Sequence, residues 1–574
     1  MTHGTILLSG SYWLIATDGQ VMARLKRWLP RADTKATGQL RVRTSPEVCA
    51  DLEAFLERFT FEIDPKHLAA LRAGAAEFRR AEERVEALLS GHYEPRAVEL
   101  GITLRGYQRV AVEMAVTMRR MLLADQMGLG KSFTACGWLK SANLFPALIV
   151  CPKQVARQWA QTVIPAALPG LRTHILDGVR PYDIAQRAAQ QELFAGKRSN
   201  NRELPDVLVT TYDRLDAWGP HLAPATGKPL VRGLVLDEVV ALRHKGTAKY
   251  AAAAALSERM EGVLGLDGYP VANYGGEIGN ILDLIRPGCL GTPEEFDREW
   301  CVAADDQRKK RIKDPIAFGL RLRNEGIMLR RTAAEVGVEL PELTVVRVPL
   351  DGDRSKLDAI RGKAGELARI ILAAGGDGLA KGRASRELDA LARQATGIAK
   401  APAAAEFIRG IVEQGERVVV GAHHIEVHNI LAEQLKEYAP AFFTGQQSDK
   451  ERAESLRRFT AAETPILVLG LRVAGAGIDG LQKCGCRIVV EVELDWAPNT
   501  HDQFRARVHR PGAHDAVTVY TLTIDDGSDP TVADVICAKR ANSSPVIDPT
   551  AALLVSGVPD DHIRRLAQAM QAKR

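Results

Sequence analysis

Long apolar runs are missing from this sequence of 574 residues, and none approaches the ~20 residues that a membrane-spanning helix needs. The first residues, MTHGTILLSGSYWLIATDG, lack the basic start and the unbroken apolar core of a secretory signal peptide. The cysteines form no C-x-x-C pair, and Cys484 and Cys486 stand one residue closer together than in the usual zinc-knuckle spacing. These absences predict a soluble cytoplasmic protein with reduced thiols and no membrane partner.

A strong excess of one charge is absent as well. Lysine and arginine number 76 against 71 aspartates and glutamates, which gives a formal net charge of +5. Attraction to a polyanion must therefore come from local basic stretches. Residues 24–43 and 308–331 are two such stretches, and each is either solvated surface or a phosphate-contacting surface. Their basic residues are Arg24, Lys26, Arg27, Arg31, Lys35, Arg41 and Arg43 in the first and Arg308, Lys309, Lys310, Arg311, Lys313, Arg321, Arg323, Arg330 and Arg331 in the second.

The chain is too long for one hydrophobic core, and its pattern changes along its length. Short apolar segments alternate with helical ones in two series, and strands this apolar are typical of parallel sheets covered on both faces. The expected strands are 121–125, 147–151, 207–212, 234–238 and 263–268 in the first series and 417–423, 466–470, 486–494 and 517–522 in the second.

Ahead of these series, segments 5–8 and 12–16 predict two strands of a small α/β module that ends in charged helices. The sequence therefore predicts an α/β protein with two tandem parallel sheets and an N-terminal accessory module. The expected domains are 1–95, 96–345, 346–540 with a helical insertion near 350–395, and a tail at 541–574.

The stretch ADQMGLGKS (124–132) follows an expected strand and precedes an expected helix. In that context backbone N–H groups and the helix N-terminus can hold phosphates. Lys131 would reach the β- and γ-phosphates, and the Ser132 hydroxyl would hold Mg²⁺. The general phosphate-loop pattern has a glycine five residues before Gly130, where this chain has Asp125.

A second part of the site is expected where LVLDE (234–238) ends. Parallel sheets place ligands at the carboxyl ends of their strands. Asp237 fits the role of the Mg²⁺ ligand, and Glu238 fits the residue that polarises the attacking water. An acidic pair at a strand end is common, but two such features in this order favour a nucleotide site.

ADQMGLGKS resembles motif I, ADEMGLGKT, of the Swi/Snf-type ATPases of helicase superfamily two, which have aspartate where Asp125 stands. The resemblance covers about residues 100–535 and implies two tandem RecA-like P-loop lobes that use ATP and Mg²⁺. The other matching segments, in order, are LRGYQ, CPKQVARQW, VTTYD, IMLRRTAAEVGVELPEL, FFTGQQSDKERAESLRRF, LGLRVAGAGIDG, ELDWAPNTHDQFRARVHRPG and VTVYTL.

The resemblance also implies roles for individual residues. Gln503 would face the cleft between the lobes, and Arg507 and Arg510 would be arginine fingers that stabilise the charge on the γ-phosphoryl group. The nucleotide-binding set is Gln108, which would read adenine, with Met127, Gly128, Leu129, Gly130, Lys131 and Ser132. The expected DNA contacts are Lys153, Thr211, Arg330, Arg331, Gly475, Gly477 and Trp496.

The chain departs from the family pattern at elements that couple the motifs. Val239 and Val240 stand where DEAH or DEGH continues after the acidic pair, and DGYP (267–270) stands where TGTP is usual. Ala506 and Ala513 replace an acidic residue and a glutamine around the fingers. Because the core residues are intact, we expect ATP hydrolysis to be retained; these residues are Lys131, Asp237, Glu238, Arg507 and Arg510. Because the coupling elements are altered, we hypothesise that DNA-stimulated hydrolysis exceeds the efficiency of translocation.

Residues 1–95, GIAKAPAAAEFI (397–408) and VVVGAHH (418–424) resemble compact bacterial and phage relatives of the HARP-type annealing helicases. This resemblance implies double-stranded or branched DNA as the partner, in a bacterial nucleoid or the cytoplasm of a phage-infected host. Two alternatives to a double-strand translocase stay open. One is a strand-separating helicase of the DEAD-box kind, and the other is a DNA-binding scaffold whose ATPase has decayed.

Overall fold

The computed structural model describes residues 2–29, 38–194, 203–271, 275–302, 310–373, 378–471, 478, 480–548 and 566–568. The chain divides into two compact units. The first unit comprises Met1–Asp125, Gly130–Arg330 and Val546–Thr550, and the second comprises Gln126–Leu129, Arg331–Pro545 and Ala551–Arg574. Among the described residues, no helix has the length and apolar character that a bilayer span requires.

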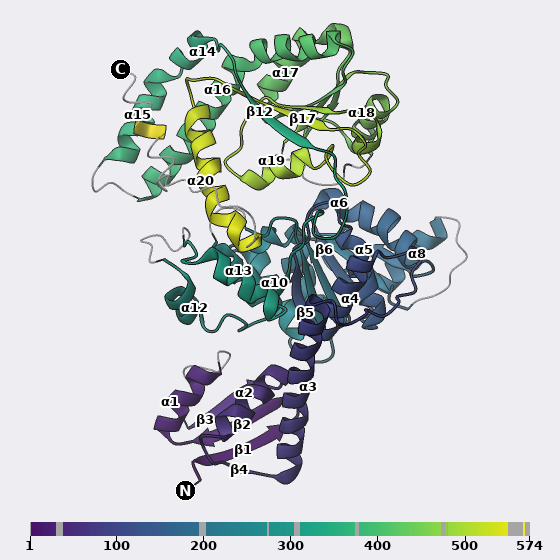
Figure 1. The fold of residues 1–574 in the computed structure, drawn as a ribbon, viewed down its shortest axis with the longest axis vertical. Helices are drawn as coiled ribbons and strands as arrows, with labels where there is room; N and C mark the ends of the chain where they lie inside the picture. Colours follow the sequence, from purple (N-terminus) through teal and green to yellow (C-terminus); the bar gives the residue numbers. More distant parts are fainter. Residues whose placement is uncertain are drawn as a thin grey trace. The chain divides into compact units, whose positions relative to one another are not determined.

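The N-terminal module has its own mixed sheet, drawn in purple in Figure 1, with the strand order β3-β2-β1-β4. Buried side chains of this sheet, among them Trp13 and Ile15, share one core with the helices, whereas Arg41 and Arg43 on the other face of β3 are exposed. The two expected strands are confirmed within one residue. The elements are β1 (Gly4–Ser9), β2 (Tyr12–Thr17), α1 (Gly19–Trp28), β3 (Gln39–Arg43), α2 (Pro46–Leu56), β4 (Glu62–Ile63) and α3 (Pro65–Leu89).

A seven-stranded sheet with the order β11-β5-β10-β9-β6-β8-β7 forms the centre of the first unit, and all of its pairings are parallel. The strands are β5 (Arg120–Leu123), β6 (Ala147–Cys151), β7 (Thr173–Ile175), β8 (Val207–Thr211), β9 (Gly233–Asp237), β10 (Gly262–Leu266) and β11 (Met328–Leu329). The helices are α4 (Gly106–Met118), α5 (Lys131–Ser141), α6 (Lys153–Gln158), α7 (Ile164–Ala167), α8 (Ile184–Phe194), α9 (Leu215–Leu222), α10 (Ala248–Arg259), α11 (Glu277–Ile285), α12 (Pro293–Trp300) and α13 (Pro315–Asn324).

The second unit contains a six-stranded parallel sheet with the order β12-β17-β16-β13-β15-β14. Its strands are β12 (Leu343–Pro349), β13 (Val418–Ala422), β14 (Ala441–Phe443), β15 (Ile466–Gly470), β16 (Ile488–Glu491) and β17 (Val517–Thr523). The helices are α14 (Arg354–Asp358), α15 (Arg361–Leu372), α16 (Gly378–Glu413), α17 (Ile425–Gln434), α18 (Asp449–Thr460), α19 (Pro498–Arg505) and α20 (Asp529–Ile547).

These two parallel sheets and the small N-terminal sheet confirm the expected fold class. Helix α20 runs through residue 540, where the sequence predicted a domain boundary. Because the strands within each large sheet are parallel, their carboxyl ends lie at one edge, and the loops that follow β5, β9 and β10 meet there. That edge brings the nucleotide-site residues of the first unit together.

Candidate functional site

The loop between β5 and α5 requires glycine for its backbone path. Gly128 and Gly130 have φ values of +88° and +79°, which L side chains rarely adopt. A Cβ atom on Gly130 would also lie 2.4 Å from Nε2 of Gln108. Gly130 is the N-cap of α5 and has no side chain to bond the first-turn amides, so the helix start has the character of an anion-binding terminus.

Lys131 lies at the start of α5, and its ammonium group is held by the backbone of the same loop. Nζ donates a hydrogen bond of 2.7 Å to the carbonyl oxygen of Asp125. Burial lowers the pKa of Lys131, and the nearby carboxylates of Glu238 and Asp125 oppose that shift. The ammonium is therefore positioned at the carboxyl edge of β5, close to acidic groups from two loops.

Gln108 on α4 connects the segment before the sheet to this loop. Its Oε1 accepts a 2.8 Å hydrogen bond from the backbone N–H of Arg105, and its Nε2 lies 3.5 Å from the carbonyl oxygen of Gly130. The side chain is 7% exposed, so its amide is oriented toward the loop and not toward bulk solvent. The structure thus places Gln108 beside the glycine loop, while its contact with adenine stays a prediction.

Asp237 and Glu238 follow β9, as the sequence predicted. Oδ2 of Asp237 accepts a 2.7 Å hydrogen bond from the indole N–H of Trp159, and the hydroxyl of Tyr212 donates to the Asp237 carbonyl at 2.7 Å. Burial raises the pKa of Asp237, and the hydrogen bond from Trp159 and the charge of Lys131 oppose it. Glu238 adopts the left-handed region at φ +53°, a strained conformation for a non-glycine residue.

Trp159 and Tyr212 were not predicted as site residues. The available signal was their place in segments CPKQVARQW and VTTYD, which match family motifs, but neither residue is charged or nucleophilic. Both act on Asp237 through a single hydrogen-bond donor, and such a role depends on the fold that brings β6, β8 and β9 side by side.

Asp267 is a further residue that sequence reasoning did not assign. Its Oδ2 accepts a 2.9 Å hydrogen bond from the backbone N–H of Val240, and its Oδ1 accepts a 2.8 Å hydrogen bond from the N–H of Tyr269. The residue is 1% exposed, and burial raises its pKa against the opposing effect of these two hydrogen bonds. One carboxylate therefore connects the DEVV loop to the DGYP loop through the backbone.

Three predicted catalytic residues lie in the second unit. Gln503 is on α19, and Arg507 and Arg510 follow its end, all partly buried. Nη1 of Arg507 donates a 3.1 Å hydrogen bond to the carbonyl oxygen of Ile478. Their action on a nucleotide held by the first unit stays a prediction. Ser132 follows Lys131 on α5 of the first unit, whereas Met127, Gly128 and Leu129 are counted with the second.

Arg330 was predicted to contact DNA, but its guanidinium is engaged inside the first unit. It makes a bidentate ion pair with Asp548 at 2.8 and 3.1 Å and donates to the carbonyls of Ala124 and Gly268. Thr211 and Arg331 are 5% and 8% exposed. This structure therefore does not present Arg330, Thr211 or Arg331 as open contact surface, because their polar groups are paired or covered.

The remaining DNA-contact predictions fall at different places. Lys153 is exposed at the start of α6, and Trp496 donates its indole N–H to Asp389 at 2.6 Å. Gly475 and Gly477 lie outside the described residues, as do several basic residues of the two stretches, namely Arg31, Lys35, Arg308 and Lys309. In the N-terminal stretch, the Arg41 guanidinium stacks 3.7 Å from the ring centroid of Tyr12.

Comparison with known proteins agrees with the geometry of this site. The chain matches the SNF2-related domain over residues 107–356 and the helicase conserved C-terminal domain over residues 400–512. It is 27% identical over 82% of its length to the SWI/SNF-related matrix-associated actin-dependent regulator of chromatin subfamily A-like protein 1 of Xenopus tropicalis. It is 24% identical over 73% of its length to the putative ATP-dependent helicase/translocase YwqA of Bacillus subtilis (strain 168).

A third relative is the DNA annealing helicase and endonuclease ZRANB3 of Bos taurus, 23% identical over 70% of this chain. The chain spans 47%, 46% and 36% of the lengths of these three relatives, which is less than half of each. Among solved structures, the Sulfolobus solfataricus SWI2/SNF2 ATPase core in complex with dsDNA is 20% identical over 79% of this chain and 95% of that one, with a TM-score of 0.35. The two matched domains together span more than half of the chain, and the chain belongs to the SNF2-related ATPases of helicase superfamily two.

Proposed function

We propose that this protein hydrolyses ATP and uses the energy to move along double-stranded DNA. The observation that carries the proposal is the arrangement of Lys131, Asp237 and Glu238 at the carboxyl edge of one parallel sheet, in a chain of the SNF2-related family. A cation at the end of the glycine loop and two carboxylates at the end of β9 are the groups that phosphoryl transfer to water requires.

The glycine loop fits the triphosphate of ATP. Lys131 Nζ now donates to a backbone carbonyl within its own loop, a partner that phosphate oxygens can replace without moving the helix. The missing Cβ atoms at Gly128 and Gly130 let the backbone come close to the ligand. Gln108, which is held beside the loop, would read the edge of the adenine.

The oxygen donors of Ser132 and Asp237 suit Mg²⁺, which prefers hydroxyl and carboxylate oxygens. When bound, the ion would supply positive charge that favours phosphoryl transfer. Glu238 would polarise the attacking water, and its left-handed backbone directs its side chain differently from that of Asp237 one residue before. Trp159, which follows α6, and Tyr212, which follows β8, hold Asp237 in place through hydrogen bonds.

Completion of the reaction is assigned to the second unit. Gln503 would face the cleft, and Arg507 and Arg510 would neutralise the charge that builds on the transferred γ-phosphoryl group. Because these groups belong to one unit and Lys131, Asp237 and Glu238 to the other, hydrolysis would require closure of the two. A cycle of closing and opening is a means of stepping along a DNA duplex.

Forks or branched DNA are proposed as the preferred substrate, since one relative is named a DNA annealing helicase and the N-terminal module offers a basic sheet face. On that face Arg41 stacks on Tyr12, a pair that can bind phosphate and base planes. We expect Arg41→Ala to weaken stimulation of ATP turnover by a fork at least threefold more than stimulation by a plain duplex.

The experiment that tests the proposal is steady-state ATP turnover with and without duplex DNA, for wild type and Lys131→Ala. We expect DNA to stimulate the wild type and the variant to fall to background, because the phosphates lose their fixed cation. Lys140→Ala, on the exposed end of the same helix, is the matched control and should behave as wild type. Absence of DNA-stimulated turnover would indicate a scaffold, and unwinding of a tailed duplex would indicate a strand-separating helicase.

A further inference from the structure

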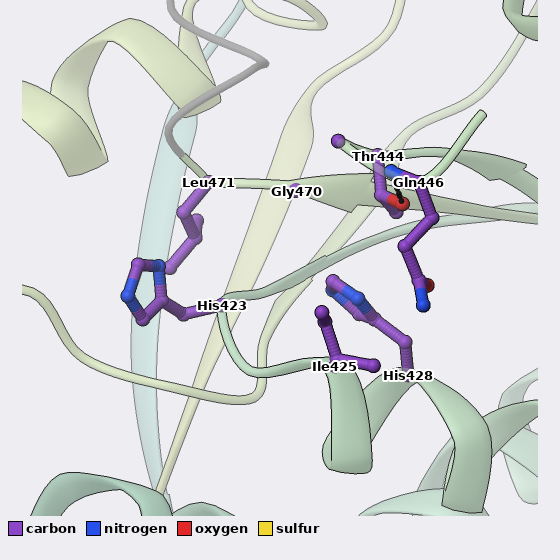
Figure 2. A pocket seen from close by; sticks show the side chains of 8 residues that line it. His423, Ile425, His428, Thr444, Gln446, Gly470 and Leu471 are labelled. Carbon is purple, nitrogen blue, oxygen red and sulfur yellow. Dashed lines mark hydrogen bonds between the residues drawn. The ribbon is translucent and has the colours of Figure 1, made fainter. Parts of the chain in front are cut away.

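A cavity in the second unit lies at the carboxyl ends of three neighbouring parallel strands, β13, β14 and β15. Its volume is about 340 Å³, within the range of small-molecule sites, and its walls come from the loops after these strands and from α17. Figure 2 shows His423, Ile425, His428, Thr444 and Gln446 around it. Carboxyl ends of parallel strands are where such sheets bind ligands.

His428 is the unusual residue of this cavity. It is 4% exposed, and neither Nδ1 nor Nε2 has a hydrogen-bond partner of ordinary geometry. Buried polar groups are nearly always paired, so an unpaired imidazole that borders a cavity indicates a partner that enters the cavity. In Figure 2 the ring points toward the space below Thr444 and Gln446.

The ring is neutral at pH 7, which limits the class of that partner. Burial lowers the pKa of His428, against smaller opposing contributions from the backbone of Ala422 and the charge of Glu493. A neutral imidazole offers one donor and one acceptor and carries no charge that would favour an anion. Among the described residues that line the cavity, none is lysine, arginine, aspartate or glutamate.

Two further residues favour a flat ligand with polar edges. Ile425, at the start of α17, is 50% exposed although it is a large apolar side chain, so it offers an apolar surface at the cavity. Gln446 is exposed, and its backbone N–H is held at 3.3 Å by the hydroxyl of Thr444, which itself donates to Gln447 at 2.7 Å. The Gln446 amide therefore stands at the opening with a donor and an acceptor of its own.

We propose that this cavity binds a nucleobase, with its face against Ile425 and its polar edge between His428 and Gln446. The proposal rests on the proposed action on DNA, because an unpaired base of a DNA strand is the source of such a ring that this protein would meet. A free nucleoside carries the same chemistry and is the second source to be distinguished. Apolar contact with a base face and hydrogen bonds to its edge are the usual means of recognising unstacked bases.

The test uses the full chain with its ATP site filled by a non-hydrolysable ATP analogue and Mg²⁺. Fluorescence anisotropy measures binding of a labelled oligothymidylate and of an abasic oligonucleotide of equal length, which keeps the phosphates and lacks the bases. We expect His428→Leu and Gln446→Ala each to weaken oligothymidylate binding about tenfold and to leave binding of the abasic strand unchanged. Asn429→Ala, an exposed position beside His428 on α17, is the matched control and should match wild type.

Saturation-transfer NMR with free thymidine then separates the two sources. If wild type gives a transfer signal with thymidine and His428→Leu abolishes it, the cavity binds nucleosides in general. If wild type gives no such signal but the variants bind oligothymidylate more weakly, the cavity binds bases only within a strand. Both results support the proposal. Equal loss of abasic-strand binding in the variants would identify a phosphate site and overturn it. The proposal would also be overturned if Gln446→Ala and a folded His428→Leu both bound oligothymidylate as tightly as wild type. Gln446 is exposed, so its substitution does not threaten folding.

The two proposals fail in different ways. A wild type that shows base-dependent strand binding but no DNA-stimulated ATP turnover would refute the motor and leave the base cavity standing. A wild type with DNA-stimulated turnover, in which the His428 and Gln446 variants bind both strands as well as wild type, would refute the cavity alone.

Discussion

At the scale of single residues, Asp267 connects two loops whose usual connecting side chains are replaced. The family pattern places a histidine after the acidic pair and hydroxyl residues in the next motif, whereas this chain has Val239, Val240 and the segment DGYP. The Asp267 carboxylate instead accepts the backbone N–H groups of Val240 and Tyr269. This connection runs through the backbone, so it does not need the histidine and hydroxyl side chains that this chain lacks at these positions.

The first prediction concerns Asp267→Asn, which keeps the size of the side chain and one of its two acceptor oxygens. One of the two backbone N–H groups should lose its partner inside the protein. We expect the free energy of unfolding to fall by about 1–3 kcal/mol and the DNA-stimulated kcat to fall about tenfold. Urea unfolding and steady-state turnover measure the two effects. Asp216→Asn, an exposed carboxylate of the same unit, is the control, and an Asp267 variant with wild-type stability and kcat would contradict the role.

Little of this detail could be predicted from the sequence. Lys131, Asp237 and Glu238 carry recognisable chemistry at recognisable spacing, and the structure brings them together at one sheet edge. Trp159 and Asp267 act through hydrogen bonds whose existence depends on the conformation of two loops. From residue type alone, Trp159 could equally be an ordinary core side chain and Asp267 an ordinary surface carboxylate.

At the scale of helices and strands, the second unit depends on a buried ion pair between α16 and α20. Lys400 and Asp529 are 0% and 3% exposed, and Nζ lies 2.7 Å from Oδ2 of the carboxylate. Lys400 also donates to the carbonyl of Leu522, and Asp529 also accepts the N–H of Ile524. The pair therefore joins both helices to the end of β17.

The second prediction is that Lys400→Met lowers the free energy of unfolding by about 3–5 kcal/mol, because the Asp529 carboxylate is left buried without its cation. The double variant Lys400→Met, Asp529→Leu should recover part of this loss, since no unpaired charge remains. Urea unfolding monitored by circular dichroism gives the values. Lys436→Met, which breaks an exposed pair with Glu433, should leave stability unchanged. Equal stability of wild type and Lys400→Met would contradict the role of the pair.

The third prediction concerns pH and Glu491 at the end of β16. Burial alone would raise the pKa of Glu491, but His501 and Arg505 outweigh it and hold the pKa far below its ordinary value. The stabilisation is therefore complete above the unfolded pKa of about 4.3 and is lost as the pH falls from there toward the folded pKa.

Glu491→Gln should lower the free energy of unfolding by about 3 kcal/mol from pH 8 to pH 5, because Arg505 loses its buried partner. The difference in the free energy of unfolding between wild type and the variant should shrink below about pH 4. In this range the Glu491 carboxyl of the unfolded wild type is already protonated, and the ionised form no longer adds full stability to the folded state. Denaturant titrations at a series of pH values measure it. Glu416→Gln, which breaks a pair with Arg487 at the surface, is the control. A wild-type advantage that grew as the pH fell below 5 would contradict the assignment.

The strands show what an apolar pattern can predict. Fully buried strands such as β6, β8 and β15 agree with the expected segments within one residue, because each begins with an unbroken run of at least three apolar residues. β7, β11 and β14 were not expected, since two or three residues show no periodicity. β12 was missed because its side chains are mostly exposed and it follows a segment expected to join two domains.

At the scale of the whole molecule, we propose that two compact units share the reaction. Lys131, Asp237 and Glu238 belong to the first, and Arg507 and Arg510 belong to the second. If ATP turnover needs both sets of residues, a substitution in either set alone must abolish it. A variant with substitutions in both sets should be no slower than either single variant, because the effects of groups that act as a unit are not additive.

The decisive measurement is ATP turnover by Arg507→Ala on saturating duplex DNA, compared with wild type, Lys131→Ala and the double variant. We expect Arg507→Ala to lose about 10³-fold or more in turnover, in the range known for arginine fingers, and the double variant to be no slower than Lys131→Ala. Turnover at the wild-type rate by a folded Arg507→Ala protein that still depends on Lys131 would contradict it.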